Sequence, residues 1–514
     1  MKKINYLSSL LLVSIYLLSS CGSSSGASVK VIIDSTRNGS VINPNDVVIT
    51  ETYQSFEEKH FYNYQVLPST GEVNILVIPI LLPAYENIDI NNDGVYDNEQ
   101  IIKDLETAFF APSEDENLAY ESVSSFYKKS SYGKLNIKGQ VTPWFDIKEA
   151  GYIYSNAAEI DVLDTYEIIE DAVKWAENEQ KIDMKQYDND KDGYIDGVWC
   201  IYSCPNYSNG GPHTEGQNYW AYTSWGNIDR EVVHPDIEKP IYNLFGWASY
   251  DFMYGGLENK IDAHTYIHET GHFLGLKDYY SDFGPYNPIG KADMMDANII
   301  DHNSYSKMLL GWSKPYIVSG KAEINLKDMQ NENSFIVIPS DNTTITNNEF
   351  DPFSEYLLIE LYTPTGLNEL DSSIKHSSSP LAPSEKGVRI YHIDNRKFVV
   401  DMISAYEVKT SLYDGHELSA TESLILPISN SRNLSVYNYA FGVDQKYNLY
   451  DEIRLIEKHN KDTFTFGGKQ SSKTLFVEND IFSLDLYGEN FFINEDRFNN
   501  GDSFTYAIQI GEIN

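Results

Sequence analysis

The sequence predicts an α+β protein, with a mixed helix-and-strand unit followed by a β-rich region. The 514 residues are 41% hydrophobic, which is typical of a folded chain and leaves room for roughly two to four domains with buried cores. Apolar positions recur at helical spacing over 160–180, and continuous apolar runs at 72–83 and 194–203 are typical of buried strands. Beyond Trp312 short β-rich runs dominate, so we expect a boundary near 320 and a sandwich-like β region over 321–514.

The unit expected over 71–320 alternates helices with strands. Besides the three segments above, we expect helices at 101–110, 117–131, 263–274 and 301–311, strands within 134–147, and a loop at 205–240 that is rich in Asn, Gly, Pro and Ser. In the β-rich region polar loops separate the expected strands, which are 334–338, 355–362, 387–393, 422–427, 463–466 and 503–510.

The N-terminus resembles the leader of a bacterial lipoprotein. Two lysines precede an apolar run at 7–18 that is too short for a transmembrane helix, and the sequence that follows, LSSCG, resembles a lipobox. We therefore expect a signal peptide at 1–20, a lipid on Cys21 that anchors the protein in the membrane, and a location in the bacterial cell envelope, at the outer membrane or cell surface. Residues 21–70 are expected to be a flexible tether followed by either a short pro-segment or a strand that joins the sheet.

The net charge and the cysteines narrow the function classes. A formal net charge of −38 excludes nucleic acid as a partner, because nucleic-acid binding needs a basic surface. The acidic excess is typical of a soluble, highly charged exterior and also of carboxylates that hold Ca²⁺. Cys200 and Cys204 could form a local disulfide or remain two free thiols on a buried strand, and the strand context favours free thiols.

The segment His268–Asp278 has the pattern H-E-x-x-H-x-x-G-x-x-D and predicts a metal centre. On a helix His268 and His272 are one turn apart and project from one face, where two imidazoles can bind one Zn²⁺. Glu269 lies beside them and can act as the general base on a water bound to that zinc. Gly275 lets the chain leave the helix, so that Asp278 can turn back as a third ligand. The combination points to a zinc-dependent peptidase.

The third zinc ligand has two candidates. Spacing favours Asp278, which follows His268 by ten positions, where metzincin-like zinc proteins place their third ligand. The alternative is Glu360, within the expected strand 355–362. In that case Asp278 would only orient an imidazole.

Two acidic loops have the spacing of cation-binding loops. Residues 188–196 have the pattern D-x-D-x-D-G-x-x-D, and 89–97 repeat it with one Asn; oxygen ligands at alternate positions wrap a hard cation, and the glycine permits the turn. The expected Ca²⁺ ligands are Asp188, Asp190, Asp192, Tyr194 and Asp196 in one loop, and Asp89, Asn91, Asp93, Val95 and Asp97 in the other. Neither loop is a standard EF-hand, and the alternative is an ordinary turn built from Asp, Asn and Gly.

Further candidates surround the motif. Met295 fits the methionine-containing turn that forms a hydrophobic floor below the zinc in metzincin-type enzymes. The alternative is an ordinary core methionine, which would be packed in the same way. Tyr305 is a candidate donor to the transition-state oxyanion. We expect His264, His302 and His392 to be surface histidines or hydrogen-bond partners of ligands rather than ligands themselves.

These motifs are similar, in sequence and in order, to those of the M6, or immune inhibitor A-like, metallopeptidases. The segment YIHETGHFLGLKDYY (266–280) resembles the active-site helix of that family, and YDNDKDGYIDGV (187–198) resembles its acidic loop. Other similar segments over roughly 70–400 are NILVIPILLP (74–83), SSFYKKSSYG (124–133), DMMD (293–296), YSKMLLGW (305–312), EYLLIELY (355–362) and GVRIYHID (387–394). The chain departs from the family at Tyr219–Tyr222, where the family has an I-W-x-H motif.

The resemblance implies a zincin-type, metzincin-like catalytic domain and a zinc-dependent endopeptidase that hydrolyses peptide bonds of extracellular proteins. Its partners would be protein or peptide substrates, and we expect a monomer. The alternative is a catalytically inactive peptidase fold used at the surface for adhesion or binding; loss of Glu269 would mark that case, and Glu269 is present. In a third hypothesis the chain is a structural lipoprotein stiffened by Ca²⁺, with an incidental histidine pair.

Overall fold

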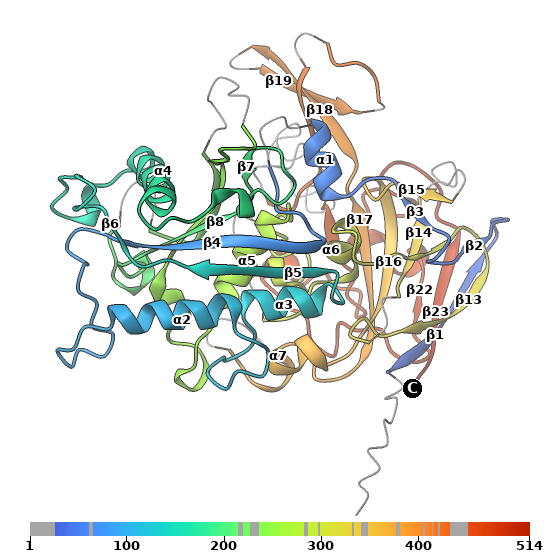
Figure 1. Ribbon diagram of the computed structural model, residues 1–514. Helices are drawn as coiled ribbons and strands as arrows, with labels where there is room; N and C mark the ends of the chain where they lie inside the picture. The colour runs from blue at the N-terminus through green and yellow to red at the C-terminus, as the bar shows by residue number, and fades with distance from the viewer. Residues whose placement is uncertain are drawn as a thin grey trace, which may run out of the picture.

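The computed structural model (Figure 1) describes residues 26–514 except for 61–64, 214–218, 227–235, 282–285, 297–298, 332–333, 341–347, 377–380, 405–406, 414, 420–421 and 432–450. The expected signal peptide at 1–20 and the expected lipid attachment at Cys21 lie outside these residues. Helices and strands are mixed in the described part, so the predicted α+β class is confirmed. No helix of that part combines the length and the apolar character that a membrane-spanning segment needs.

A mixed sheet forms the centre of the N-terminal part of the molecule, with the strand order β5-β4-β8-β11-β9 and with β6 beside β4. Its strands are β4 (Gly71–Leu81), β5 (Leu135–Val141), β6 (Phe145–Asp146), β8 (Val198–Tyr202), β9 (Tyr222–Trp225) and β11 (Leu244–Ser249). β4 pairs in parallel with β5 and β8, β8 pairs in parallel with β11, and β9 is antiparallel at the edge. The central position of β4 explains its nearly continuous apolar sequence, because both of its faces are buried.

Helices cover both faces of this sheet. They are α2 (Asn98–Phe110), α3 (Val123–Ser130), α4 (Val162–Asn178) and α5 (His264–Phe273). α2, α3 and α5 share a buried core with Ile75 and Val77 of β4, whereas α4 shares a core with the alternate residues Leu76 and Ile78. This alternation follows from the period of two in a strand, and in Figure 1 α4 lies on the opposite side of β4 from α2 and α3.

Two sheets form much of the C-terminal part. One has the order β13-β1-β23-β22 and the other the order β2-β12-β14-β16-β17-β21. Their strands are β1 (Ser28–Ser35), β2 (Val41–Ile42), β12 (Tyr316–Val318), β13 (Ala322–Lys327), β14 (Ile336–Pro339), β16 (Glu355–Tyr362), β17 (Gly387–Asp394), β21 (Ile453–Leu455), β22 (Ile481–Phe482) and β23 (Tyr506–Ile513). Apolar residues of both sheets, such as Val31 and Ile359, share one buried core.

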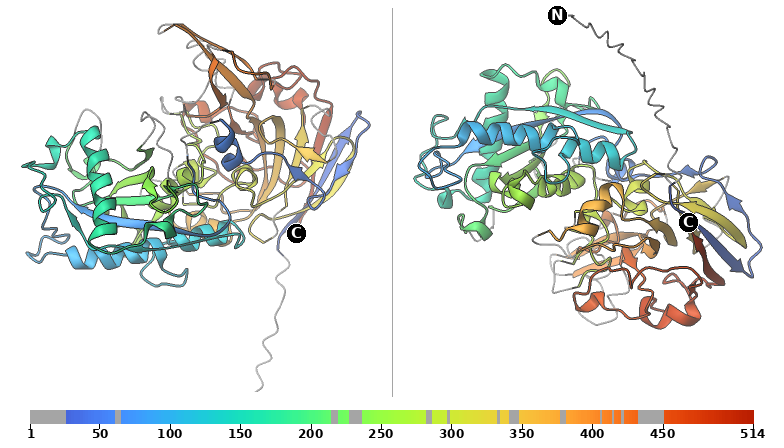
Figure 2. Two further views of the ribbon diagram at one scale, coloured as in Figure 1. Left: turned by 45° about the horizontal axis from the view of Figure 1, so that its top comes forward. Right: turned by 90° about the horizontal axis from the view of Figure 1, so that it is seen from below.

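The first described strand, β1, belongs to the C-terminal part, and a shared core joins that part to the N-terminal part. β1 pairs antiparallel with both β13 and β23, so the segment from Ser28 to Ser35 is a strand that joins a sheet. Figure 2 shows the two parts side by side, with β1, drawn in blue, within the C-terminal part. The core beneath α5 also crosses position 320, because it contains Trp312 as well as Val337 and Tyr391.

The remaining elements are short or lie at the periphery. They are β3 (Val48–Ile49), α1 (Tyr53–His60), β7 (Tyr194–Ile195), β10 (Ile241–Tyr242), α6 (Ser304–Leu309), β15 (Glu349–Phe350), α7 (Glu369–Ser373), β18 (Lys397–Ser404), β19 (Glu407–Leu412), β20 (Glu422–Pro427) and α9 (Leu484–Phe491). β18, β19 and β20 form a sheet of their own, which projects at the top of Figure 1. Cys200 and Cys204 are buried free thiols, the state that the strand context favoured.

Some of the expected elements are wrong. The segment expected as strand 463–466 contains a 3₁₀ turn, Phe464–Phe466, which ends at Gly467 with a φ of 79°, a left-handed conformation that breaks an extended chain. The expected loop at 205–240 contains the edge strand β9, whose sequence YTSW has no alternation of apolar and polar residues. Helix α9 was not expected either.

Candidate active site

Helix α5 holds His268 and His272 next to each other. Their ring centroids are 5.1 Å apart and their ring planes are inclined at 87°. The Nδ1 of His268 lies 2.9 Å from the carbonyl oxygen of Met294, and the Nδ1 of His272 lies 2.8 Å from that of Leu276. A carbonyl oxygen can only accept, so each Nδ1 carries a proton, and each Nε2 is the nitrogen that faces Asp278 and is left for a metal. Both rings are therefore held in the tautomer that binds a metal through Nε2.

Asp278 reaches the two imidazoles from beyond the end of the helix. Gly275 has a φ of 94°, the left-handed conformation that turns the chain away from α5. This turn brings Asp278 Oδ1 to 3.1 Å from His268 Nε2 and to 3.4 Å from His272 Nε2. Burial raises the pKa of the Asp278 carboxyl, but the two facing imidazoles outweigh burial and hold that pKa well below its ordinary value.

Glu269 points into the same region from α5 and is buried. Thr223, on the edge strand β9, donates its hydroxyl to the Glu269 carbonyl oxygen at 3.1 Å and lies 3.3 Å from Glu269 Oε2. Burial raises the pKa of the Glu269 carboxyl above its ordinary value, against the opposing effect of the two imidazoles. A carboxylate of raised pKa is a stronger base, so the environment suits proton transfer. Thr223 was missed at the sequence level, because nothing in the sequence links it to Glu269.

A short 3₁₀ turn, Met294–Asp296, lies against α5 and supports it. A Cβ atom on Gly271 would lie 2.3 Å from Met295 Sδ, so a larger residue at position 271 would force the Met295 side chain to shift. The buried Asp293 holds the turn, because its Oδ1 accepts a hydrogen bond from Met295 N at 2.8 Å. The sequence did not reveal the two roles of this turn, in which Met294 fixes the tautomer of His268 and Met295 packs against the helix.

Glu360, the alternative third ligand, belongs to a different network. Its Oε2 accepts hydrogen bonds from the backbone N and the hydroxyl of Ser304, at 2.8 and 2.5 Å. Its Oε1 accepts from Arg389 at 3.2 Å and from Tyr391 at 3.1 Å. The carboxylate that the structure groups with His268 and His272 is that of Asp278.

Three other candidates have roles in the core. The Tyr305 hydroxyl is buried and donates to Glu452 Oε1 at 2.8 Å, so the suggestion that it binds an oxyanion is wrong. His302 lies 3.1 Å from Asp293 and His392 lies 2.8 Å from Glu355, and both rings are buried. These two histidines are therefore core residues with carboxylate partners rather than surface residues.

A cleft of about 450 Å³ opens in front of α5, and His268 and Glu269 are among the residues that line it. Tyr280 lines the same cleft, with its ring stacked at 23° to that of His268 and a centroid distance of 6.5 Å. The sequence placed Tyr280 two positions after Asp278 but gave no separate signal for it. The cleft is large enough to receive a short length of an extended polypeptide.

The acidic loop 188–196 gathers four carboxylates. Asp188, Asp190, Asp192 and Asp196 each offer an oxygen atom, and these atoms lie within 4.8 Å of one another. Burial raises the pKa of Asp192 to about 7 and raises that of Asp196 well above its ordinary value, and neighbouring carboxylates add to both shifts. The buried Oδ1 of Asp196 has no hydrogen-bond partner among the described residues. Tyr194, the one predicted ligand of this loop that is not an aspartate, is the first residue of strand β7.

The loop 89–97 has the same internal hydrogen bonds as 188–196. In each loop the two oxygens of the first aspartate, Asp89 or Asp188, accept from the backbone N–H groups four and five positions further on. The last aspartate, Asp97 or Asp196, accepts from the N–H of the second residue. The loop 89–97 is the more exposed of the two, and Val95 is 61% exposed.

The chain matches one protein-family model and no curated protein. Residues 73–300 match the model of the catalytic domain of the immune inhibitor A peptidases, family M6, and the match contains His268, Glu269, His272, Asp278 and both acidic loops. The expected similarity extended to about residue 400, so the segment 301–400 lies outside the match. Residues 73–300 therefore match a peptidase catalytic domain of family M6, and this match supports a metallopeptidase.

Proposed function

We propose that the protein is a zinc-dependent endopeptidase that hydrolyses peptide bonds of extracellular proteins, with zinc held by His268, His272 and Asp278. The observation that carries this proposal is the convergence of two Nε2 atoms and one carboxylate oxygen beside a buried glutamate, at distances of 3.1 and 3.4 Å between nitrogen and oxygen. Nitrogen and carboxylate oxygen are donors that zinc accepts, and three protein ligands leave the fourth position open, as catalytic sites require.

The residues of the cleft have distinct tasks. When bound, zinc supplies Lewis acidity for polarising a carbonyl and for lowering the pKa of water. Glu269 is the base that takes a proton from the attacking water and passes it to the leaving amine, and its raised pKa suits both transfers. Thr223 holds the backbone of Glu269 and contacts its carboxylate, so the base stays in one position.

The position of β9 supports a polypeptide substrate. This strand ends the order β5-β4-β8-β11-β9 among the described residues, and Thr223 connects it to Glu269. An edge strand offers unpaired backbone N–H and C=O groups, to which an extended peptide can add as a further strand. A peptide bound in this way would pass in front of α5.

Removal of zinc tests the proposal. Dialysis against 1,10-phenanthroline with Ca²⁺ still supplied is expected to abolish casein digestion, and addition of Zn²⁺ is expected to restore it, because the donor set suits zinc. The measurement is the rate of release of acid-soluble peptides, paired with zinc content by elemental analysis. Undiminished digestion by zinc-free protein would show that the site is not a zinc centre.

We further propose that the loops 89–97 and 188–196 bind Ca²⁺ and stabilise the fold. The loop 188–196 is joined to β4, because Asn74 N donates to Asn189 Oδ1 at 2.7 Å and Asn189 Nδ2 donates to the Asn74 carbonyl at 3.1 Å. Cation binding to this loop therefore braces the central strand of the catalytic sheet. Because the loop 89–97 has the same pattern of internal hydrogen bonds as 188–196, we propose that it binds Ca²⁺ as well.

Excess EGTA, with Zn²⁺ still supplied, is expected to lower the melting temperature. A ligand that binds only the folded state adds about 2.7 kcal/mol at a concentration one hundred times its Kd, and this contribution is lost on removal. Calorimetry of wild type, of Asp188→Ala and of the exposed control Asp46→Ala checks this. The control should respond to EGTA like wild type, and Asp188→Ala should respond less. A melting curve of wild type that EGTA leaves unchanged would exclude calcium from both loops.

Finally, we propose that a lipid on Cys21 anchors the protein in the cell envelope. Cys21→Ser is expected to release the protein from membranes into the soluble fraction, because the lipid is the anchor that the sequence offers. Fractionation followed by immunoblotting checks this, with Ser23→Ala as the control that stays membrane-bound. If Cys21→Ser remains with membranes in high salt, lipidation at Cys21 is not the anchor.

A further inference from the structure

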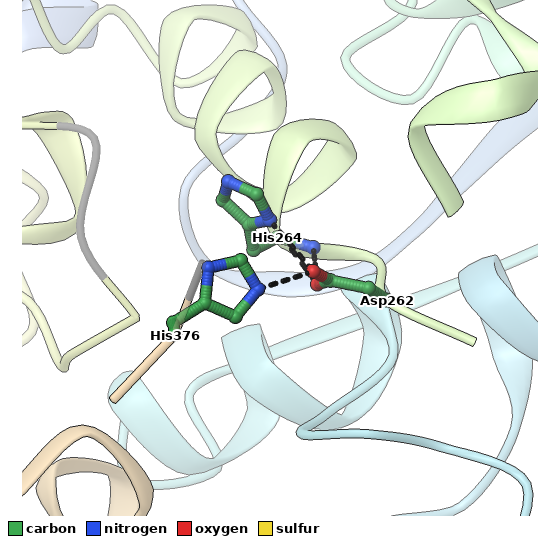
Figure 3. A group of neighbouring side chains, drawn as sticks. All are labelled: Asp262, His264 and His376. Carbon is green, nitrogen blue, oxygen red and sulfur yellow. Dashed lines mark hydrogen bonds and ion pairs between the residues drawn. The ribbon is translucent and has the colours of Figure 1, made fainter. Parts of the chain in front are cut away.

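A second group of metal-type donors lies in the same cleft and comprises Asp262, His264 and His376. Asp262 lies two residues before His264, the first residue of α5, and His376 follows α7 in the C-terminal part. His376 Nε2 lies 2.7 Å from Asp262 Oδ2, and His264 Nδ1 lies 3.1 Å from each Asp262 oxygen. Figure 3 shows both imidazoles turned toward the one carboxylate. His376 falls outside the matched segment 73–300, so the group draws on both parts of the chain.

This group repeats the composition and the dimensions of the first. Each consists of two imidazoles and one aspartate, with one donor atom per residue. The ring centroids of His264 and His376 are 5.1 Å apart at an angle of 70°, compared with 5.1 Å and 87° for His268 and His272. The second group therefore has the donors and the spacing that suit zinc in the first.

The burial of the second group calls for a compensating positive charge. The side chains of Asp262 and His376 are each 4% exposed, whereas that of His264 is 19% exposed and faces the cleft. Among the described residues, the ion-pair partners of Asp262 are these two histidines, and no lysine or arginine joins them. A buried carboxylate is costly without a charged partner, so either a protonated imidazole or a bound cation must supply the positive charge.

We propose that Asp262, His264 and His376 bind a second divalent transition-metal ion, of the class of Zn²⁺. His264 and His268 are four positions apart on α5, about 6 Å along the axis, and the two donor sets share no residue, so the second ion has a site of its own. Bound there, the ion fastens the segment after α7 to the start of α5 and so fixes one wall of the cleft. The open side of the site, at His264, is left for water or for a donor group of the substrate.

Counting zinc in the full-length chain tests this inference independently of catalysis. After dialysis against metal-free buffer that contains Ca²⁺, wild type is expected to hold about two zinc ions per chain, one for each group of three donors. His376→Gln is expected to hold about one, because glutamine can keep the hydrogen bond to Asp262 but is a poor zinc ligand. His268→Ala/His272→Ala should also hold about one, and addition of His376→Gln to this pair should remove it. The partly exposed His459 supplies the control His459→Gln, which should keep both ions.

A titration of zinc-free wild type with Co²⁺ counts the sites without any substitution. Absorbance in the visible range is expected to rise until about two equivalents are bound, and circular dichroism checks that each variant is folded. One equivalent in wild type, unchanged in His376→Gln, would overturn the inference and leave Asp262, His264 and His376 as a hydrogen-bonded network. That result would leave the proposed catalytic zinc site unaffected. Zinc bound at that site is expected to be lost in the His268→Ala/His272→Ala variant and not in His376→Gln.

Discussion

Replacement of Glu269 by glutamine is expected to lower kcat/KM for protein substrates by about 10²–10⁴-fold, with zinc content and melting temperature close to those of wild type. Glutamine keeps the volume of the side chain and can keep the contact with Thr223, but it cannot accept the proton of the attacking water. The loss corresponds to about 3–5 kcal/mol of transition-state stabilisation. Initial rates on casein and on a quenched fluorescent peptide measure it, with zinc determined on the same samples.

Glu452→Gln is the matched control for this substitution. Glu452 is as buried as Glu269, and burial raises its pKa to about 7, but its Oε1 accepts hydrogen bonds from Tyr53 and Tyr305 in the core. The same chemical change at this position should leave kcat/KM within a few-fold of wild type. If Glu269→Gln retained the kcat/KM of Glu452→Gln and of wild type, Glu269 would not be the general base. If wild type itself digested neither substrate, the alternative of an inactive peptidase fold would be favoured.

The sequence predicts those residues of the site that lie close together along the chain. His268, Glu269, His272 and Asp278 lie within one helix and the turn after it, so the helical period and the left-handed Gly275 are sufficient to bring them together. The two acidic loops are local for the same reason, because their hydrogen bonds join residues within each loop.

Contacts between distant segments are the part that the sequence does not predict. Thr223 reaches Glu269 from an edge strand that has no apolar alternation, and His376 reaches Asp262 across 114 positions. The pairing of β1 with β23 joins the two ends of the described chain, and nothing in either strand identifies the other as its partner. The segment 463–466 shows the opposite error, since its alternating phenylalanines suggested a strand whereas a left-handed glycine ends a turn there.

Asp278→Ala is expected to leave the first site unable to retain zinc. Loss of a side chain that only orients a ligand costs about 10–100-fold in metal affinity, and loss of a ligand should cost more. Asp278 Oδ1 lies 3.1 and 3.4 Å from the two Nε2 atoms, so its removal leaves the two imidazoles as the remaining members of the proposed ligand set. Competition with a chromophoric chelator measures the affinity. The measurement is made in the His376→Gln background, so that zinc at the second site does not contribute.

Glu360→Gln, in the same background, is the comparison that separates the two candidates. Glutamine at position 360 keeps an oxygen that can accept hydrogen bonds from Ser304 and Arg389. Alanine would leave the buried Arg389 charge unpaired and destabilise the protein by about 3–5 kcal/mol. We expect Glu360→Gln to keep zinc with nearly wild-type affinity, because the oxygens of Glu360 already accept hydrogen bonds from Ser304, Arg389 and Tyr391. If Asp278→Ala keeps zinc and Glu360→Gln loses it, the third ligand is Glu360. Asp278 would then serve only to orient His268 and His272, and binding would require β16 and α5 to move relative to each other.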